Sequence, residues 1–173
     1  MRRFAGTVAG VIGFAICMVG CGDPDSNVPP PMASGPADPT DARAVAAGEA
    51  VYLAHCGSCH GTRLQGQPNW QQALPDGGYP APPHDGSGHT WRHSDQQLFE
   101  ATKFGGDFSA APGSVSHMPA FEHVLSDDEI WAALAFVKSR WPAELQALAR
   151  LLTRMRSRSQ HAGHIEQAGD RAE

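Results

Sequence analysis

The chain has 173 residues, of which 41% are hydrophobic, and its formal net charge is −5. This length favours one domain with appended segments, and 19 Gly and 14 Pro predict that much of the chain is loop. The negative charge argues against nucleic-acid binding, which needs a basic surface.

The N-terminal stretch has the pattern of an export signal. Arg2 and Arg3 precede an apolar run rich in Gly and Ala, as in a signal peptide, and the run is shorter than the ~20 apolar residues of a membrane span. Gly20 stands directly before Cys21, which resembles the site at which bacterial lipoproteins are cleaved and lipidated. We therefore expect residues 1–20 to be a lipoprotein signal peptide and Cys21 to carry the lipid. The alternatives are ordinary secretion with cleavage nearby and an uncleaved anchor.

Residues 21–40 predict a Pro-rich linker. They include three consecutive prolines at 29–31 and show no hydrophobic period, so the segment should be extended and semi-rigid. At about 3 Å per residue, such a linker would hold a domain some tens of ångströms from a membrane.

A first helix is predicted over about 41–55, with Thr40 or Asp41 as its N-cap. Residues at three- and four-residue intervals share one face of this helix. They are Val45, Gly48, Tyr52 and Cys56.

The helix leads into a cysteine motif, His55-Cys56-Gly57-Ser58-Cys59-His60. Cys-x-x-Cys-His is the signature of covalent c-type haem attachment: the two thiols add to the haem vinyl groups, and His60 reaches the iron as proximal ligand. A redox dithiol would not need His60, and a zinc site would bring a second pair of ligands, yet no Cys follows Cys59. The motif predicts one covalent haem c. Of the remaining cysteines, Cys17 lies in the predicted leader and Cys21 is the predicted lipidation site.

The stretch after the motif is loop-rich and contains three histidines. Gly and Pro mark turns over 61–83, and His84, His89 and His93 follow. Their spacing matches no closed metal site. We interpret residues 84–93 as a polar loop near the haem edge, in which Trp91 and Arg92 contact the ring or its propionates. The alternatives are a second metal site and a histidine from this loop on the iron.

A short helix over 94–104 and a second loop lead to a candidate distal ligand. Met118 is the only Met between residues 41 and 141, and a thioether is a soft ligand that favours ferrous iron and raises the potential. We expect Met118 to be the distal ligand, with His117 and His123 as its nearest rivals. The plain alternative is a Met that only fills the core.

The last part of the sequence predicts one helix with a clear start signal, followed by a C-terminal tail. Ser126 and Glu129 form a capping box at the start of a helix that ends at Trp141-Pro142. Residues 142–173 form a C-terminal helical and disordered tail, in which apolar residues at helical spacing alternate with arginines. This segment either folds back on its own domain or lies on an anionic membrane or a partner. Disorder is expected from Ser159 onward.

Over about residues 41–141 these features resemble the class I cytochrome c family. The resemblance rests on the first helix with its haem motif, on the run Met118-Pro119-Ala120-Phe121, and on the closing helix. It implies an all-α, loop-rich cytochrome c fold with three to four short helices wrapped around one covalent haem. It also implies that a Pro carbonyl accepts a hydrogen bond from His60. The candidates are Pro80, Pro82 and Pro83, of which Pro82 and Pro83 are favoured. A further implication is that Gly48 allows a close helix crossing near Ala133.

The expected function is one-electron transfer by a lipid-anchored, exported cytochrome c on the periplasmic side of a bacterial membrane. With His60 and Met118 on the iron, no position is left for a small-molecule substrate. The chain is therefore not expected to be an enzyme itself, although it could serve as the cytochrome subunit of an oxidoreductase. The alternative is a haem-based small-ligand sensor or a peroxidase-like enzyme with an open sixth position.

The charge pattern bears on the expected partners, which are redox proteins of the respiratory chain or a periplasmic dehydrogenase. Residues 41–141 carry eleven acidic and six basic side chains. A docking partner should therefore present a neutral, apolar or basic surface to this domain.

Overall fold

The computed structural model describes residues 37–109 and 115–169. The predicted signal peptide, Cys21 and nearly all of the predicted linker lie outside these ranges. Within them all regular secondary structure is helical, and no strand occurs. The predicted all-α fold class is confirmed.

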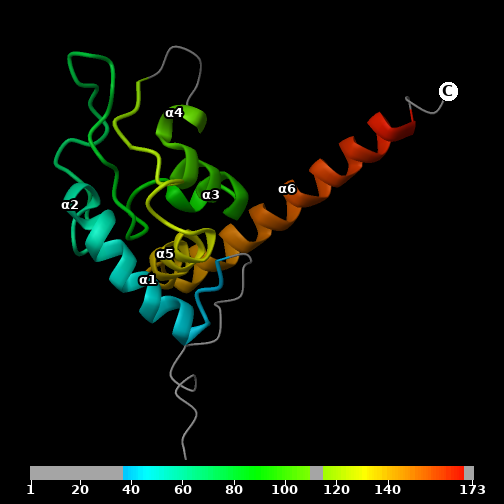
Figure 1. The fold of residues 1–173 in the computed structure, drawn as a ribbon, viewed down its shortest axis with the longest axis horizontal. Coiled ribbons are helices and arrows are strands. Elements are labelled where there is room, and N and C mark those ends of the chain that lie inside the picture. The colour runs from blue at the N-terminus through cyan, green and yellow to red at the C-terminus, as the bar shows by residue number, and fades with distance from the viewer. Residues whose placement is uncertain (1–36, 110–114, 170–173) are drawn as a thin grey trace, which may run out of the picture. The chain divides into compact units, whose positions relative to one another are not determined.

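Seven helical segments follow one another along the described chain (Figure 1). Four are longer than one or two turns, and loops make up most of the stretch between residues 61 and 94. The segments are α1 (Ala42–His55), α2 (Gly57–His60), the 3-10 turn η2 (Thr90–Arg92), α3 (Asp95–Phe104), α4 (Gly106–Ser109), α5 (Asp127–Ser139) and α6 (Ala143–Gly169).

Helices α1 and α5 cross in direct backbone contact. Asp41 caps α1 by accepting hydrogen bonds from the N–H groups of Arg43 and Ala44. A Cβ atom added to Gly48 would lie 1.9 Å from the carbonyl oxygen of Ala132 and 2.9 Å from the nitrogen of Ala133. The predicted close crossing at Gly48 is confirmed, and it brings the haem motif at the end of α1 beside the core.

The capping boxes fix where α3 and α5 begin. Ser94 and Gln97 form one box, and Ser126 and Glu129 form the other, so two orphan N–H groups of each helix are satisfied locally. The two helices meet at Phe99 on α3 and Trp131 on α5, whose rings stack with centroids 4.4 Å apart. Most of α5 is buried from Ile130 to Lys138, and this helix forms the centre of the core.

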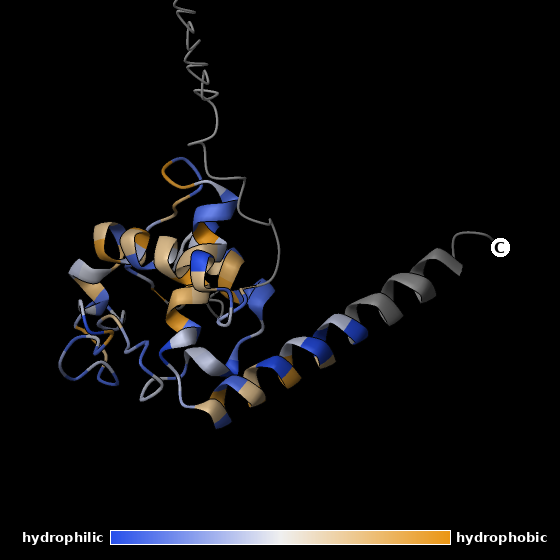
Figure 2. Ribbon diagram, turned by 90° about the horizontal axis from the view of Figure 1, so that it is seen from below, coloured by the Kyte–Doolittle hydropathy of each residue, from blue (hydrophilic) through white to orange (hydrophobic). Residues whose placement is uncertain are grey.

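The first turns of α6 pack on the domain. Leu145 and Ala149 join the apolar cluster that contains Tyr52, Phe136 and Trp141, while the exposed side of these turns mixes polar residues with exposed leucines, such as Leu148 and Leu151 (Figure 2). The helix continues to Gly169, whereas disorder was expected from Ser159; no Pro follows Pro142 to end it. No helix within the described residues is both long enough and apolar enough to cross a membrane.

A buried ion pair connects α3 to α5. The Lys138 ammonium donates to both carboxylate oxygens of Asp95, at 2.8 and 2.9 Å. The hydroxyl of Thr153, on α6, also donates to Asp95 Oδ1, at 3.2 Å. One carboxylate at the start of α3 thus joins three helices.

Candidate functional site

His60 is held at the end of the short helix α2 with one ring nitrogen already engaged. Cys56 ends α1 by donating its N–H to the carbonyl of Tyr52, and its own carbonyl accepts the N–H of His60. The His60 side chain is only 8% exposed, and its Nδ1–H donates to the carbonyl oxygen of Pro82 at 2.9 Å. The expected Pro partner is thereby identified as Pro82. This bond leaves Nε2 as the nitrogen that is available to a metal.

The electrostatics of His60 favour the neutral imidazole. Burial lowers the pKa of His60, and the hydrogen bond to Pro82 acts in the opposite direction. A neutral imidazole is the form that binds a metal, and a carbonyl on the far nitrogen raises its basicity and fixes its orientation.

The two cysteines of the motif are free thiols, of which Cys56 is the N-cap of α2 and Cys59 lies within it. Cys56 is half-buried and Cys59 is exposed. Burial, together with the neighbouring Cys59, raises the pKa of the Cys56 thiol to about 11. Both side chains line an apolar hollow of about 60 Å³, which also borders His60. The thiols therefore remain accessible from the cavity side.

Met118 is fixed against the end of α3 by backbone hydrogen bonds. The N–H of Gly106 donates to the Met118 carbonyl at 3.1 Å, and Phe121 N–H donates to carbonyls of the last turn of α3. The N–H of Met118 itself donates to Ser116 Oγ at 3.2 Å. Gly105 makes this approach possible: it has a φ of +90°, and an added Cβ would lie 3.2 Å from the Met118 carbonyl oxygen.

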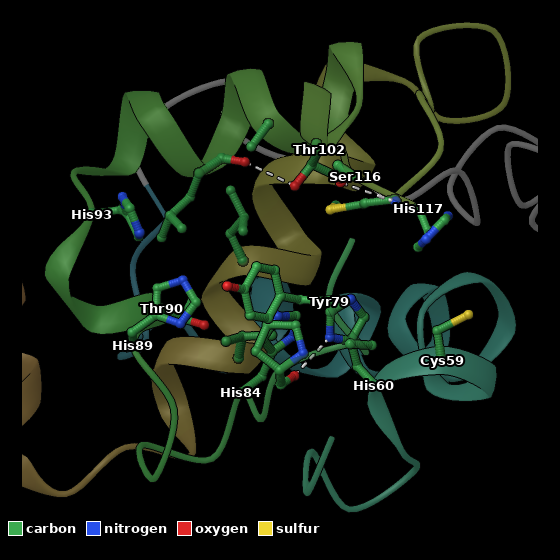
Figure 3. A pocket seen from close by; sticks show the side chains of 18 of the residues that line it. Cys59, His60, Tyr79, His84, His89, Thr90, His93, Thr102, Ser116 and His117 are labelled. Carbon is green, nitrogen blue, oxygen red and sulfur yellow. Dashed lines mark hydrogen bonds between the residues drawn. The ribbon is translucent and has the colours of Figure 1, made fainter. Parts of the chain in front are cut away.

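His60 and Met118 line the same cavity, which has a volume of about 370 Å³. Figure 3 shows His60 on one side of this cavity and Thr102 and Ser116 on the other. The walls between them are largely apolar and come from α3 and α5. They include Leu98, Ala101, Leu134 and Val137.

The loop over 84–93 contributes histidines to the cavity, and not the Trp and Arg that were expected to face the haem. His84, His89, Thr90 and His93 line the cavity, and Figure 3 shows the last three together on the side away from Cys59. The Trp91 indole N–H donates to the Gly88 carbonyl, and the Arg92 guanidinium lies over the Trp91 ring at 5.1 Å. No sequence pattern indicates which polar residues of this stretch turn inward, because it has no periodicity.

His84 is in direct contact with His60. The two rings are stacked, with centroids 3.9 Å apart and planes at 19°. His84 Nδ1 is buried and has no hydrogen-bond partner, while the backbone of His84 is fixed through bonds from its N–H to Leu64 and from the Trp141 indole to its carbonyl. Nothing in the sequence pattern indicated this stack. No group of three or more His, Cys, Asp or Glu suited to a metal ion occurs in residues 37–109 and 115–169.

The rival distal ligands differ in position. His117 lines the cavity, and its Nε2 lies 3.0 Å from an oxygen of Asp76, with about half of each side chain exposed. His123 has 90% of its side chain exposed and lies near Glu122. Of the two, only His117 borders the cavity.

Acidification is expected to destabilise the protein through His84. Burial lowers the pKa of His84 well below its ordinary value, so the unfolded chain binds this proton more readily than the folded chain. The stability that neutral His84 contributes is therefore fully present above its unfolded pKa of about 6.5, and this contribution is lost progressively as the pH falls below that value. Guanidinium unfolding between pH 7 and pH 5 should show a smaller loss of stability in His84→Leu than in the unmodified protein. His123→Leu is the exposed control, and an equal pH dependence in both variants would contradict this role of His84.

The comparison with known families is decisive for the domain. Residues 43–137 match the family model described as cytochrome C oxidase, cbb3-type, subunit III. The chain belongs to this cytochrome c family. The resemblance seen in the sequence is thus confirmed, and the domain is of a kind that binds haem covalently and transfers electrons. No curated protein and no solved structure matches the chain.

The residues of the cavity fit a haem c. A cytochrome c domain needs two thiols beside a histidine whose outer nitrogen is free, and the described chain has this set at one edge of the cavity. The soft thioether of Met118 borders the same cavity, and the apolar walls suit the flat macrocycle. The buried, unpartnered Nδ1 of His84 adds a polar atom that lacks a partner within the protein.

Proposed function

We propose that the protein carries one electron at a time through a single haem c that is attached to Cys56 and Cys59 and ligated by His60 and Met118. The observation that carries this proposal is the placement of His60 and Met118 on one cavity. His60 belongs to the motif, whereas Met118 comes from the loop between α4 and α5, so only the fold brings these two donor atoms together.

The bound haem supplies the reversible change between ferric and ferrous iron, and the chain's residues set its conditions. Pro82 orients the imidazole of His60 through Nδ1–H. The N–H of Gly106 and the hydroxyl oxygen of Ser116 hold the Met118 backbone in place, which would keep its thioether in position to bind the iron in either oxidation state. Leu134, Val137 and their neighbours exclude water from the cavity walls. A His/Met ligand pair raises the potential compared with two histidines.

Exchange of Met118 tests this function. Met118→Ala should abolish the weak ferric band at the red edge of the spectrum that reports sulfur–iron ligation, and it should lower the midpoint potential, because a thioether favours ferrous iron. The band should persist in Met155→Ala, a matched change in α6. The measurement is the optical spectrum of both oxidation states together with a potentiometric titration.

The competing function is a sensor or peroxidase-like enzyme with an open sixth position. The observation in its favour is His117, which lines the cavity beside Met118 and has Asp76 as an acidic partner. This arrangement predicts a high-spin ferric spectrum and carbon monoxide binding by the ferrous form. A bis-His spectrum would instead retain electron transfer and move the distal ligand to a histidine.

We further propose that the protein is a periplasmic, lipid-anchored carrier that exchanges electrons with respiratory redox proteins. Support comes from the signal and lipoprotein pattern that ends at Cys21 and from the family, whose description names an oxidase subunit. The acidic balance of residues 41–141 favours a partner with a neutral, apolar or basic docking surface.

A further inference from the structure

The polar end of the cavity is made of imidazoles. His89 and His93 both line the cavity, both are half-buried, and their rings meet edge to face with centroids 5.4 Å apart. The Trp70 ring stacks on His89 at 5.7 Å. Thr90, between them in the chain, is buried and faces the same cavity. These residues form a built, partly enclosed wall, which we call the imidazole wall (His89, Thr90 and His93).

The imidazole wall has no acidic partner within the described part of the chain. The salt bridges of histidine there belong to His117 and His123. The carboxylate of Asp95, two residues after His93 in the sequence, pairs with Lys138 and accepts a hydrogen bond from Thr153. Two titratable rings thus face a cavity whose remaining walls are largely apolar, with nothing of opposite charge to bind them.

The charged and titratable groups around the wall come from several elements. Arg92 of η2 acts on both rings and Arg156 of α6 acts on His93, and both arginines disfavour a second positive charge. His84 lies on the side toward His60. At other parts of the cavity are Tyr79 and His117, the latter paired with Asp76.

We propose that His89 and His93 bind the carboxylate edge of the haem and that this pair takes up a proton when the haem iron is reduced. The inference rests on the proposed function. On reduction one electron arrives from the redox partner at the iron, and a larger fraction of the molecules binds one proton from solvent at the imidazole pair. On oxidation the electron returns to a redox partner and the proton returns to solvent. The domain then couples electron transfer to proton transfer.

The sign of the coupling follows from electrostatics. Burial first, and the neighbouring charges second, lower the pKa of both rings, whereas a carboxylate within hydrogen-bond reach raises it. An added electron makes the site more negative and so favours the protonated imidazole. The midpoint potential should therefore fall as the pH rises through the range in which the pair titrates.

The experiment is a potentiometric titration of the haem-loaded protein at several pH values between 5 and 8.5. We expect the midpoint potential of the unmodified protein to fall with rising pH, and its slope to drop by at least half in His89→Gln/His93→Gln. His123→Gln, a substitution of an exposed histidine, should keep the original slope. A pH-independent potential in the unmodified protein, or an unchanged slope in the double variant, overturns the inference.

Two readouts separate the possible failures. The sulfur–iron band is recorded in the same samples: its absence from the unmodified protein contradicts the proposed function, whereas its presence with a pH-independent potential overturns only the proton coupling. If the double variant does not load haem, a pH-indicator dye in weakly buffered solution measures protons released as ferricyanide oxidises the unmodified protein. Release of a fraction of a proton per haem supports the inference, and no release refutes it.

Discussion

Gly48→Ala is expected to destabilise the protein by about 3 kcal/mol, the upper end of the typical cost of overpacking a core contact. The added Cβ would lie 1.9 Å from the oxygen and 2.4 Å from the carbon of the Ala132 carbonyl. Both atoms belong to the backbone of α5, so no side-chain rotation relieves the clash, and α1 and α5 must separate.

A second substitution separates the effect of the steric clash from the effect of helix propensity. Alanine is preferred over glycine inside a helix by about 1 kcal/mol, so propensity alone would make Gly48→Ala stabilising. Ala50→Gly, at an exposed position of the same helix, measures that preference directly. Chemical unfolding of both variants gives the comparison. Equal or greater stability of Gly48→Ala would show that the two helices do not meet at this point.

Lys138→Met is expected to cost about 3–5 kcal/mol, because removing one partner of a buried ion pair leaves an uncompensated charge. The side chains of Lys138 and Asp95 are 3% and 9% exposed. Among the described residues, the remaining side-chain donor to Asp95 would be the hydroxyl of Thr153, which cannot neutralise a carboxylate. Thermal or guanidinium unfolding of the haem-loaded protein measures this effect.

Two further variants test whether the buried charge is the cause. Lys103→Met breaks the pair of Lys103 with Asp127, whose side chains are 25% and 55% exposed, and should cost below about 1 kcal/mol. Lys138→Met/Asp95→Asn removes both charges and should recover a substantial part of the lost stability. If Lys138→Met is no more harmful than Lys103→Met, the Asp95–Lys138 pair does not carry the stability assigned to it.

The elements that could be predicted from the sequence are those with local signals. The capping boxes at Ser94 and Ser126 and the N-cap at Asp41 depend on residues within three positions of one another, and the haem motif is a contiguous run. The close helix crossing at Gly48 could also be predicted, because a glycine in the middle of a helix costs stability and therefore needs a packing reason.

The remaining features depend on contacts between distant segments. Lys138 has the sequence appearance of a surface lysine, and only the fold brings it to Asp95. The stack of His84 on His60 and the inward direction of His89 and His93 arise in a loop without periodicity, where no pattern states which side chains are buried. Composition predicts disorder from Ser159 onward, whereas α6 continues to Gly169 in the structure.

The bonds made by α6 also define how much chain must fold together. Thr153 exchanges hydrogen bonds with Asp95, as acceptor from its N–H and as donor to its carboxylate, and Ala149 is buried in the cluster around Tyr52. Arg156 donates to the Arg92 carbonyl beside the imidazole wall. A chain cut after Trp141 would therefore lose part of its own hydrophobic interior, and the minimal autonomous folding unit extends at least four turns beyond the conventional end of the haem domain.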